Sequence, residues 1–378
     1  MNRWNQALVA AACAAVATLA NAEVKIGVSL SLSGPASGLG IPMNNALKLW
    51  PQTIAGEKVT LTVLDDATDP TKGVQNARRF VTDEQVDLLL GSSTTPVAIA
   101  MADVATESKT VQLSLSPAGL PPGRDGWTFR VPHSNGVMAS AVVSHMKKFG
   151  IKTVGFLGYS DAYGEVWLQE MKVRLESAGI KLVAVERFAR TDTSVTAQAL
   201  KIVSANPDAI LVVASGSGAA MPHLAMVDRG FKGKVYQTHA AATRDLMRIG
   251  GKSVEGAFVS SAAAIVAEQL PDSHKVKTEA MRYASTYDKA YGAGSRNALA
   301  AHAWDIYLIL NRVLPTALQK AKPGTAEFRQ ALKDALESTR EIVVTGGVLN
   351  YTSSDHWGYG EKDGEILKVV NGDWRLEP

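Results

Sequence analysis

Short apolar runs rich in valine, isoleucine and leucine alternate with helical patterns along the first part of this chain. The predicted strands cover residues 24–30, 59–64, 86–90, 111–115 and 127–131. The predicted helices cover residues 71–82, 96–107 and 137–149. A strand followed by a helix, repeated several times, is typical of a parallel sheet with helices on both faces.

The same cycle starts again after Gly150. Its predicted strands cover residues 153–157, 182–187, 209–214, 234–238 and 256–260. Its predicted helices cover residues 165–177, 195–205 and 220–229. We therefore predict an α/β protein built from two doubly wound, Rossmann-like lobes.

The C-terminal part of the chain breaks this rhythm. Helical patterns over residues 274–291, 297–320 and 325–338 precede a glycine-rich tail with short strands at 366–370 and 374–376. We infer that the chain crosses back to the first lobe and then again to the second, so that three crossings form a hinge beside a cleft. The predicted lobes comprise residues 23–133 plus 262–342, and residues 134–261 plus 343–378.

Residues 1–22 match the regions of an export signal in order. Arg3 is the only charged residue before Glu23, and the apolar stretch between them ends in small residues. That stretch is shorter than the roughly 20 apolar residues that a membrane span needs. We predict cleavage after Ala22 and export of the remaining chain; the alternative is a buried N-terminal helix.

Cys13 is the only cysteine, and it lies inside the predicted signal. Lipid attachment at Cys13 is a minor alternative, because Ala10 stands where such sites usually carry a bulky residue. After cleavage the chain has no thiol, which excludes cysteine catalysis, disulfides and thiolate metal sites.

The balance of charges argues against a nucleic-acid partner. Without Arg3 the chain has 38 basic and 36 acidic residues, a net charge of about +2. Nucleic-acid-binding domains usually concentrate basic residues on one face.

Catalytic and metal-binding motifs are missing from the sequence. It contains no GxSxG, no HExxH, no Walker loop and no GxGxxG after a strand. For single histidines such as His145 or His302, we favour packing over catalysis. We therefore expect no enzymatic activity, no metal and no cofactor.

Hydroxyl side chains gather where predicted strands end. They are Ser31, Ser33 and Ser37 after the first strand, Ser92, Ser93, Thr94 and Thr95 after the third, and Ser114 and Ser116 with the fourth. The carboxyl ends of parallel strands share one edge, outside which ligands bind. Hydroxyls and free N–H groups near helix starts can hold a carboxylate without a buried lysine or arginine. The alternative for each residue is that it caps the following helix.

Several segments together resemble one protein family. They read EVKIGVSLSLSGPASG, GSSTTP, LSLSPAG, GFLGYSDAYGE and HAWDIY. The sequence resembles the type I periplasmic solute-binding proteins of the branched-chain amino acid ABC transporter family over almost its whole exported length. The resemblance implies a periplasmic, monomeric protein whose two lobes close on a small ligand and dock on an inner-membrane ABC permease, without changing the ligand chemically.

The resemblance also implies which residues bind the ligand. Ser92, Ser93, Thr94 and the backbone at Ala118 correspond to its carboxylate contacts, while Tyr163, Ser217 and His239 correspond to the second lobe's contribution. For Ser217, a role as a turn residue is at least as plausible. We add Ser33, Leu39 and Ser116 from the strand-end loops, which gives ten candidate site residues.

Two departures from the family pattern bear on the ligand. Leu120 replaces a threonine, and residues 239–243 contain no acidic residue, although family members hold the amino-acid ammonium at these places. An enclosed ammonium without a counter-charge costs several kcal/mol. Leu39 replaces the usual aromatic residue and leaves room for a ring. We therefore expect an aromatic acid or a 2-oxo acid, with His239 available to donate a hydrogen bond to a second oxygen.

Three alternatives stay open at this point. The chain could bind a branched-chain or other amino acid, as members of the family do. It could instead be the ligand-sensing subunit of a receptor, or a secreted hydrolase.

Overall fold

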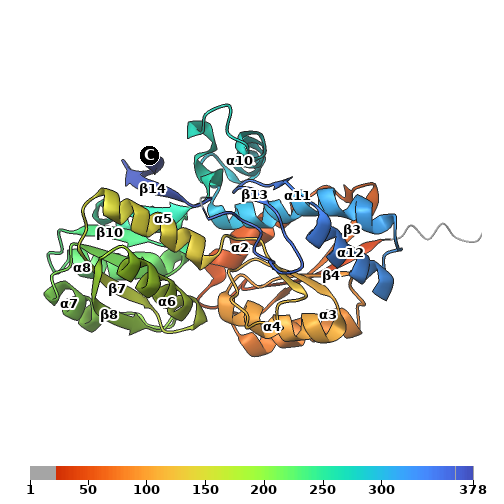
Figure 1. Ribbon diagram of the computed structural model, residues 1–378, viewed down its shortest axis with the longest axis horizontal. Coiled ribbons are helices and arrows are strands. Elements are labelled where there is room, and N and C mark those ends of the chain that lie inside the picture. Colours follow the sequence, from red (N-terminus) through yellow and green to blue (C-terminus); the bar gives the residue numbers. More distant parts are fainter. Residues whose placement is uncertain (1–22, 362, 378) are drawn as a thin grey trace, which may run out of the picture.

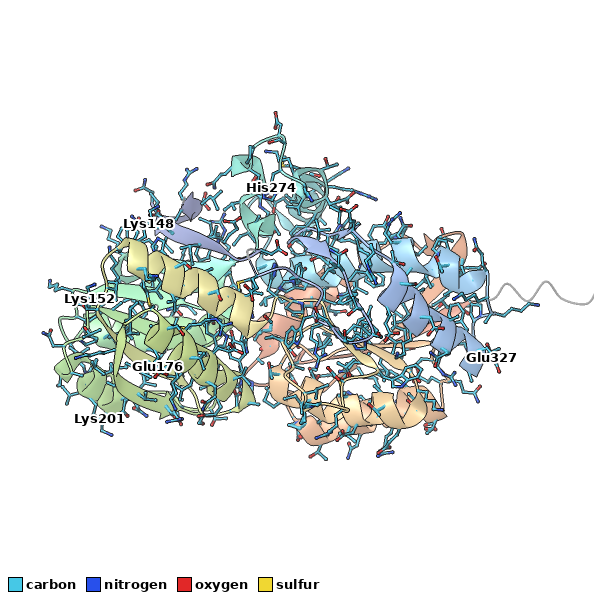
Figure 2. All side chains as sticks on the ribbon, viewed as in Figure 1. Lys148, Lys152, Glu176, Lys201, His274 and Glu327 are labelled. Carbon is cyan, nitrogen blue, oxygen red and sulfur yellow. The ribbon has the colours of Figure 1, made fainter. Side chains whose placement is uncertain are left out.

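The computed structural model describes residues 23–361 and 363–377 and shows two lobes side by side (Figure 1). The predicted signal peptide and Cys13 lie outside the described residues. Charged side chains such as Lys152, Lys201 and Glu327 point outward from the two lobes (Figure 2).

The first lobe is built on a six-stranded sheet of order β2-β3-β1-β4-β5-β6. All neighbouring pairs are parallel except β2 with β3. Its strands are β1 (Val24–Leu30), β2 (Thr53–Ile54), β3 (Glu57–Asp65), β4 (Leu88–Gly91), β5 (Val111–Ser114) and β6 (Thr128–Arg130).

Helices cover both faces of this sheet, as the uninterrupted apolar strands require. In β4, Leu88 and Leu90 face one core, while Leu89 between them packs with Phe80 and Met101 in another. These opposite faces follow from the two-residue period of a strand. The covering helices are α2 (Ser37–Leu47), α11 (Ala298–Leu318) and α12 (Ala326–Ser338) on the first face, with α3 (Pro70–Thr82) and α4 (Thr95–Ser108) on the second.

The second lobe has a seven-stranded sheet of order β15-β14-β11-β10-β9-β7-β8. Only β14 and β15 run antiparallel to their neighbours. Its strands are β7 (Thr153–Tyr159), β8 (Lys181–Phe188), β9 (Ala209–Val213), β10 (Lys234–Gln237), β11 (Phe258–Ser261), β14 (Glu365–Val370) and β15 (Asp373–Glu377). Its helices are α5 (Asn135–Lys148), α6 (Ala162–Ser177), α7 (Thr196–Ser204), α8 (Ala220–Val227) and α9 (Arg244–Gly250).

Short elements complete the fold. The 3₁₀ turns are η1 (Gly216–Ala219), η2 (His239–Ala241), η3 (Gly251–Val254) and η4 (Ala263–Gln269). Helix α10 (Lys277–Tyr291) lies above the junction of the lobes in Figure 1. Strands β12 (Ile342–Val343) and β13 (Val348–Leu349) form a small hairpin.

The chain passes between the lobes three times in the described residues: after β6, after β11 and before β14. The sequence pattern predicts the third boundary after residue 342, but the β12–β13 hairpin that spans this position packs on the first lobe. Leu349, Tyr351 and Tyr359 all belong to the first lobe's core, and the Tyr351 hydroxyl donates to the carbonyl of Arg130 at 2.7 Å. The third crossing therefore follows Tyr359.

Candidate ligand-binding site

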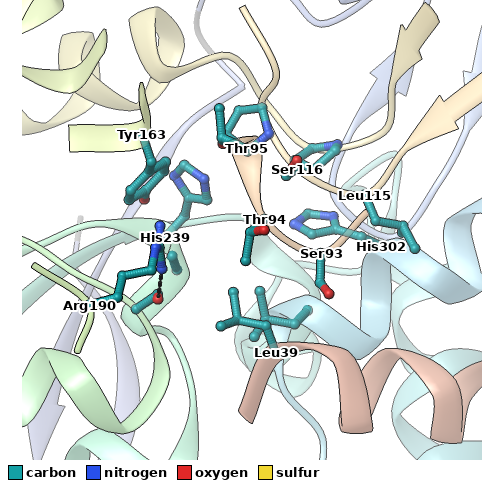
Figure 3. A pocket seen from close by; sticks show the side chains of 15 residues that line it. Leu39, Ser93, Thr94, Thr95, Leu115, Ser116, Tyr163, Arg190, His239 and His302 are labelled. Atoms are coloured by element: carbon teal, nitrogen blue, oxygen red, sulfur yellow. Dashed lines mark hydrogen bonds between the residues drawn. The ribbon is translucent and has the colours of Figure 1, made fainter. Parts of the chain in front are cut away.

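A cavity of about 370 Å³, partly open to solvent, lies between the lobes (Figure 3). The carboxyl ends of strands from both sheets lead into it, as the wound topology predicts. Its lining residues are Leu39, Ser93, Thr94, Thr95, Leu115, Ser116, Pro117, Pro132, Leu299 and His302 from the first lobe and its first crossing, and Tyr163, Arg190, Ser215, His239 and Ala240 from the second.

The first-lobe wall contains hydroxyls that have no partner in the described structure. Thr94 is the N-cap residue of α4, yet its side chain makes no capping hydrogen bond. By contrast, Ser134 and Thr325 cap α5 and α12 in the expected way. The buried Oγ atoms of Thr94, Thr95 and Ser116 accept and donate no hydrogen bond there. The capping alternative therefore fails for Thr94.

Thr94 and Thr95 lie at the N-terminus of α4, where a helix favours negative charge. The N-terminus of α4 carries a partial positive charge of about half a unit. A buried polar group without a partner costs about 1–3 kcal/mol, so a bound anion at this wall would relieve that cost. We name Thr94, Thr95 and Ser116, together with Ser93, whose Oγ accepts from the Ser31 N–H at 2.9 Å, the hydroxyl cradle.

Arg190 supplies the second-lobe wall with a cation that the sequence analysis missed. Its Nε donates to Asp161 Oδ2 at 2.5 Å and its Nη1 donates to Ser215 Oγ at 2.9 Å. Its guanidinium lies 4.1 Å from the centre of the Tyr159 ring. Three neighbours thus fix a side chain that is only 12% exposed. Arg190 follows the carboxyl end of β8, so the strand-end rule could have identified it.

Asp161 does two things in this arrangement. Its Oδ1 accepts hydrogen bonds from the backbone N–H groups of Tyr163 and Gly164 and so caps α6. Its Oδ2 holds Arg190. The cap of α6 therefore also positions the cation of the cavity.

Two histidines and a tyrosine complete the polar lining. The Tyr163 hydroxyl donates to Thr238 Oγ1 at 2.8 Å, and its ring meets that of His239 edge to face at 5.9 Å. Burial lowers the pKa of His239 to about 3 and that of His302 to about 4. Both imidazoles are therefore neutral at pH 7, with nitrogens that have no partner among the described residues.

Four of the ten predicted residues lie outside the cavity lining. The exposed Ser33 donates to Asp65, and Ser217 is exposed on η1 while Ser215 takes the cavity position. Ala118 is buried, with its N–H donating to the Ser116 carbonyl and its own carbonyl accepting from Arg130. The structure brings together Leu39, Ser93, Thr94, Ser116, Tyr163 and His239.

Ser92, the fourth, belongs to a buried network around Asp66. The carboxylate of Asp66 accepts from the hydroxyls of Ser29 at 3.1 Å, Ser31 at 2.7 Å and Ser92 at 2.7 Å. All four residues are fully buried. The network ties together the carboxyl ends of β1, β3 and β4, directly beneath the hydroxyl cradle.

No acidic side chain is among the lining residues that the structure describes. The first acidic residue after the 239–243 segment, Asp245, pairs instead with Arg248 at 2.8 Å. The cavity thus offers donors to an anion but no carboxylate to an ammonium.

Burial of neutral imidazoles predicts a loss of stability in acid. His145, His223, His239 and His302 have folded-state pKa values of about 4, 4, 3 and 4, against about 6.5 when unfolded. Below about pH 6.5 the unfolded chain binds more protons, so the unfolding free energy falls as the pH drops toward 4.

Asp305 acts in the opposite direction, because burial raises its pKa to about 7. Its contribution to the unfolding free energy is present at low pH and is lost as the pH rises through that value. We expect the melting temperature to fall as the pH is lowered from about 6.5 to about 4. A melting temperature independent of pH over that range would contradict this prediction. His223→Gln, which leaves the cavity untouched, should make the decline shallower.

Within residues 23–361 and 363–377, no group of three or more His, Cys, Asp or Glu side chains is placed to hold a metal ion. A search of the same residues for a helix long and apolar enough to cross a membrane finds none.

Two wound lobes that enclose a partly polar cavity define a two-lobed small-molecule binding protein. A family model described as periplasmic binding protein matches residues 23–372, so the chain belongs to that family. Its members are periplasmic solute-binding proteins that work with ABC transporter permeases.

Individual relatives agree with this assignment. The chain is 25% identical over 346 residues to the Leu/Ile/Val-binding protein BraC3 of Rhizobium johnstonii, covering 89% of each chain. It is 43% identical to an extracellular ligand-binding receptor from Rhodopseudomonas palustris, with a TM-score of 0.92 over 94% of this chain and 100% of that one. A solute-binding protein of an R. palustris ABC transporter, solved with benzoate, shares the fold at 18% identity and a TM-score of 0.78, over 94% of this chain and 95% of that one.

Proposed function

We propose that this protein captures a small carboxylate with a flat apolar body, an aromatic acid or aromatic 2-oxo acid, for import by an ABC permease. The observation that carries the proposal is the cavity itself. It combines unpartnered hydroxyls and a fixed arginine with no acidic side chain among its described lining residues.

In this proposal the carboxylate is held from both lobes. The hydroxyl cradle and the N-terminus of α4 donate from the first lobe, and Arg190 donates from the second. Charge-assisted hydrogen bonds of this kind contribute about 1.5–3 kcal/mol each. Beside the cradle, the Ser92 hydroxyl donates to Asp66 and the Ala118 N–H donates to the Ser116 carbonyl.

The apolar body of the ligand would occupy the remaining wall. Leu39, Leu115 and Leu299 line this wall. Figure 3 shows Leu39 and Leu115, with the Tyr163 ring on the opposite lobe. Apolar surface contributes about 25 cal/mol per Å² that the ligand buries against it. A leucine ligand would bury similar surface but would enclose its ammonium without a counter-charge.

The likeness to the benzoate-bound structure supports the fold alone at its level of identity. It is consistent with the proposal in that this fold encloses an aromatic acid in another protein. The names of the curated relatives favour the second candidate, a branched-chain amino acid, which the same experiment tests.

Calorimetry on refolded, ligand-stripped protein tests the proposal with benzoate, phenylacetate, cinnamate and benzoylformate against leucine. We expect binding of at least one aromatic acid and none of leucine. The neutral isostere benzamide should bind at least about tenfold more weakly than benzoate, because it forfeits charge-assisted hydrogen bonds. Binding of leucine with no aromatic acid bound would contradict the proposal.

Trp167 offers a second readout of the same titration. It is fully buried, and its ring lies 6.0 Å from that of His239, behind the cavity wall. Its fluorescence should therefore change as the cavity fills.

We further propose export to the periplasm with cleavage after Ala22, a monomeric state, and transient docking on an inner-membrane permease. Mass spectrometry of the exported protein would test the cleavage site and any lipid on Cys13.

A further inference from the structure

Before a ligand enters, the positive charge of Arg190 is balanced by the negative charge of its ion-pair partner Asp161. Arg190 is the one lysine or arginine among the described lining residues, and Asp161 pairs with it at 2.5 Å. A carboxylate therefore adds a negative charge that this pair does not balance. The partial charge of about half a unit at the N-terminus of α4 offsets only part of it.

His302 lies where it could hold a proton that compensates the negative charge of a bound carboxylate. It lies on α11 with 4% of its surface exposed, lines the cavity, and presents its ring beside Ser93 and Ser116 of the hydroxyl cradle (Figure 3). Its Nδ1 has no hydrogen-bond partner among the described residues.

Asp305 lies directly behind His302, one turn along the same helix. Its Oδ2 is 4.0 Å from His302 Nδ1 and has no hydrogen-bond partner in the described structure. Its Oδ1 accepts from the backbone N–H of Thr345 at 2.8 Å, which fixes the carboxyl group. Burial raises the pKa of Asp305 to about 7, so its charge is incomplete at neutral pH.

The other titratable groups that face this pair are either uncharged or, in the case of Glu279, not among the residues that line the cavity. Desolvation lowers the pKa of His133 and His239 and raises that of the neighbouring tyrosines, which keeps all of them uncharged. Glu279 on α10 faces Asp305 and pairs with Arg282. The groups that face the pair are His133, His239, Glu279, Tyr283, Tyr351 and Tyr359.

We propose that His302 is a ligand-contacting residue and that carboxylate binding takes up a proton onto the His302–Asp305 pair. The inference rests on the proposed function, because it requires a carboxylate at the cradle. With the ligand bound, the imidazole lies between two carboxyl groups, and both favour its protonated form. The pair shares the proton, so the uptake belongs to both residues together. Asp305 is then a positioning residue for His302.

Proton uptake makes affinity depend on pH. Uptake means that the bound state holds more protons than the free state, so affinity falls as the pH rises. Between about pH 7 and pH 9 the loss should reach at most about tenfold per pH unit, the limit for one full proton. The ligand carboxylate itself stays ionised throughout this range.

Calorimetric titration with the tightest-binding aromatic acid in buffers of different ionisation enthalpy measures the protons taken up. We expect a positive value of up to about one proton for the wild type. His302→Gln and Asp305→Asn should each bind the ligand with a strongly reduced uptake and a flatter pH profile. His223→Gln removes a buried histidine outside the cavity and should keep the wild-type uptake.

The outcomes separate this inference from the proposed function. Tight carboxylate binding with no proton uptake would overturn the inference alone, as would an uptake that both substitutions leave unchanged. Failure of every carboxylate to bind would overturn both. Circular dichroism of each variant confirms folding before titration, and if His302→Gln does not fold, Asp305→Asn alone decides.

Discussion

Replacing Arg190 by glutamine is expected to weaken binding of an aromatic carboxylate by about 2–5 kcal/mol, which is at least about 30-fold in Kd. The substitution removes the cavity's cation and leaves the carboxylate of Asp161 without its ion-pair partner. Titration calorimetry of the variant against benzoate or benzoylformate measures the effect. Benzamide affinity should change much less, because this ligand is uncharged.

Arg187→Gln is the matched control for this prediction. Arg187 lies near the end of β8, the strand that Arg190 follows. It is 42% exposed and pairs with Glu165 at the surface. Surface pairs contribute about 0–1 kcal/mol, and neither member of this pair is among the residues that line the cavity. Equal losses of affinity in the two variants would show that Arg190 acts through general stability or surface charge and would contradict its assigned role.

Replacing Asp66 by alanine is expected to lower the unfolding free energy by about 3 kcal/mol or more. The substitution leaves the buried hydroxyls of Ser29, Ser31 and Ser92 without their acceptor. It also frees the backbone N–H of Thr68, which donates to Asp66 Oδ1 at 3.0 Å. Urea unfolding followed by circular dichroism gives the free energy directly.

Two comparison variants sharpen this second prediction. Asp66→Asn keeps one oxygen acceptor and should cost less than the alanine change. Asp65→Ala removes the adjacent carboxylate, which is exposed and whose hydrogen bonds can be replaced by water. A loss in Asp65→Ala as large as that in Asp66→Ala would contradict the importance of the buried network.

The strands were predictable because their signal is local. The prediction for residues 24–30 coincides with β1, and the start predicted for residues 111–115 coincides with that of β5. The helix α2 was missed, since its first residues, Ser37 to Gly40, include two glycines and Pro42 follows within the helix. Packing of Leu39, Met43 and Leu47 into the first core holds this helix in spite of its weak intrinsic propensity.

The hydroxyl residues show where the site prediction succeeded and where it stopped. The sequence predicts that these residues lie near the carboxyl edge of the sheet, and Thr94 and Ser116 do line the cavity. The sequence does not predict the direction in which each side chain points. Ser92 and Thr94 are two residues apart, but Ser92 turns inward to Asp66 and Thr94 turns to the cavity.

The sequence by itself determined the two-lobed α/β architecture, the family and the edge of each sheet at which a ligand would bind, since these depend on periodicity and on residue type along the chain. Only the tertiary structure decided the charge balance of the cavity. Arg190, Asp161 and the His302–Asp305 pair come from three separate segments, and the separation of these segments in sequence says nothing about their distance in space. Whether a buried group is charged depends on those distances and on exclusion from water, which no local pattern encodes.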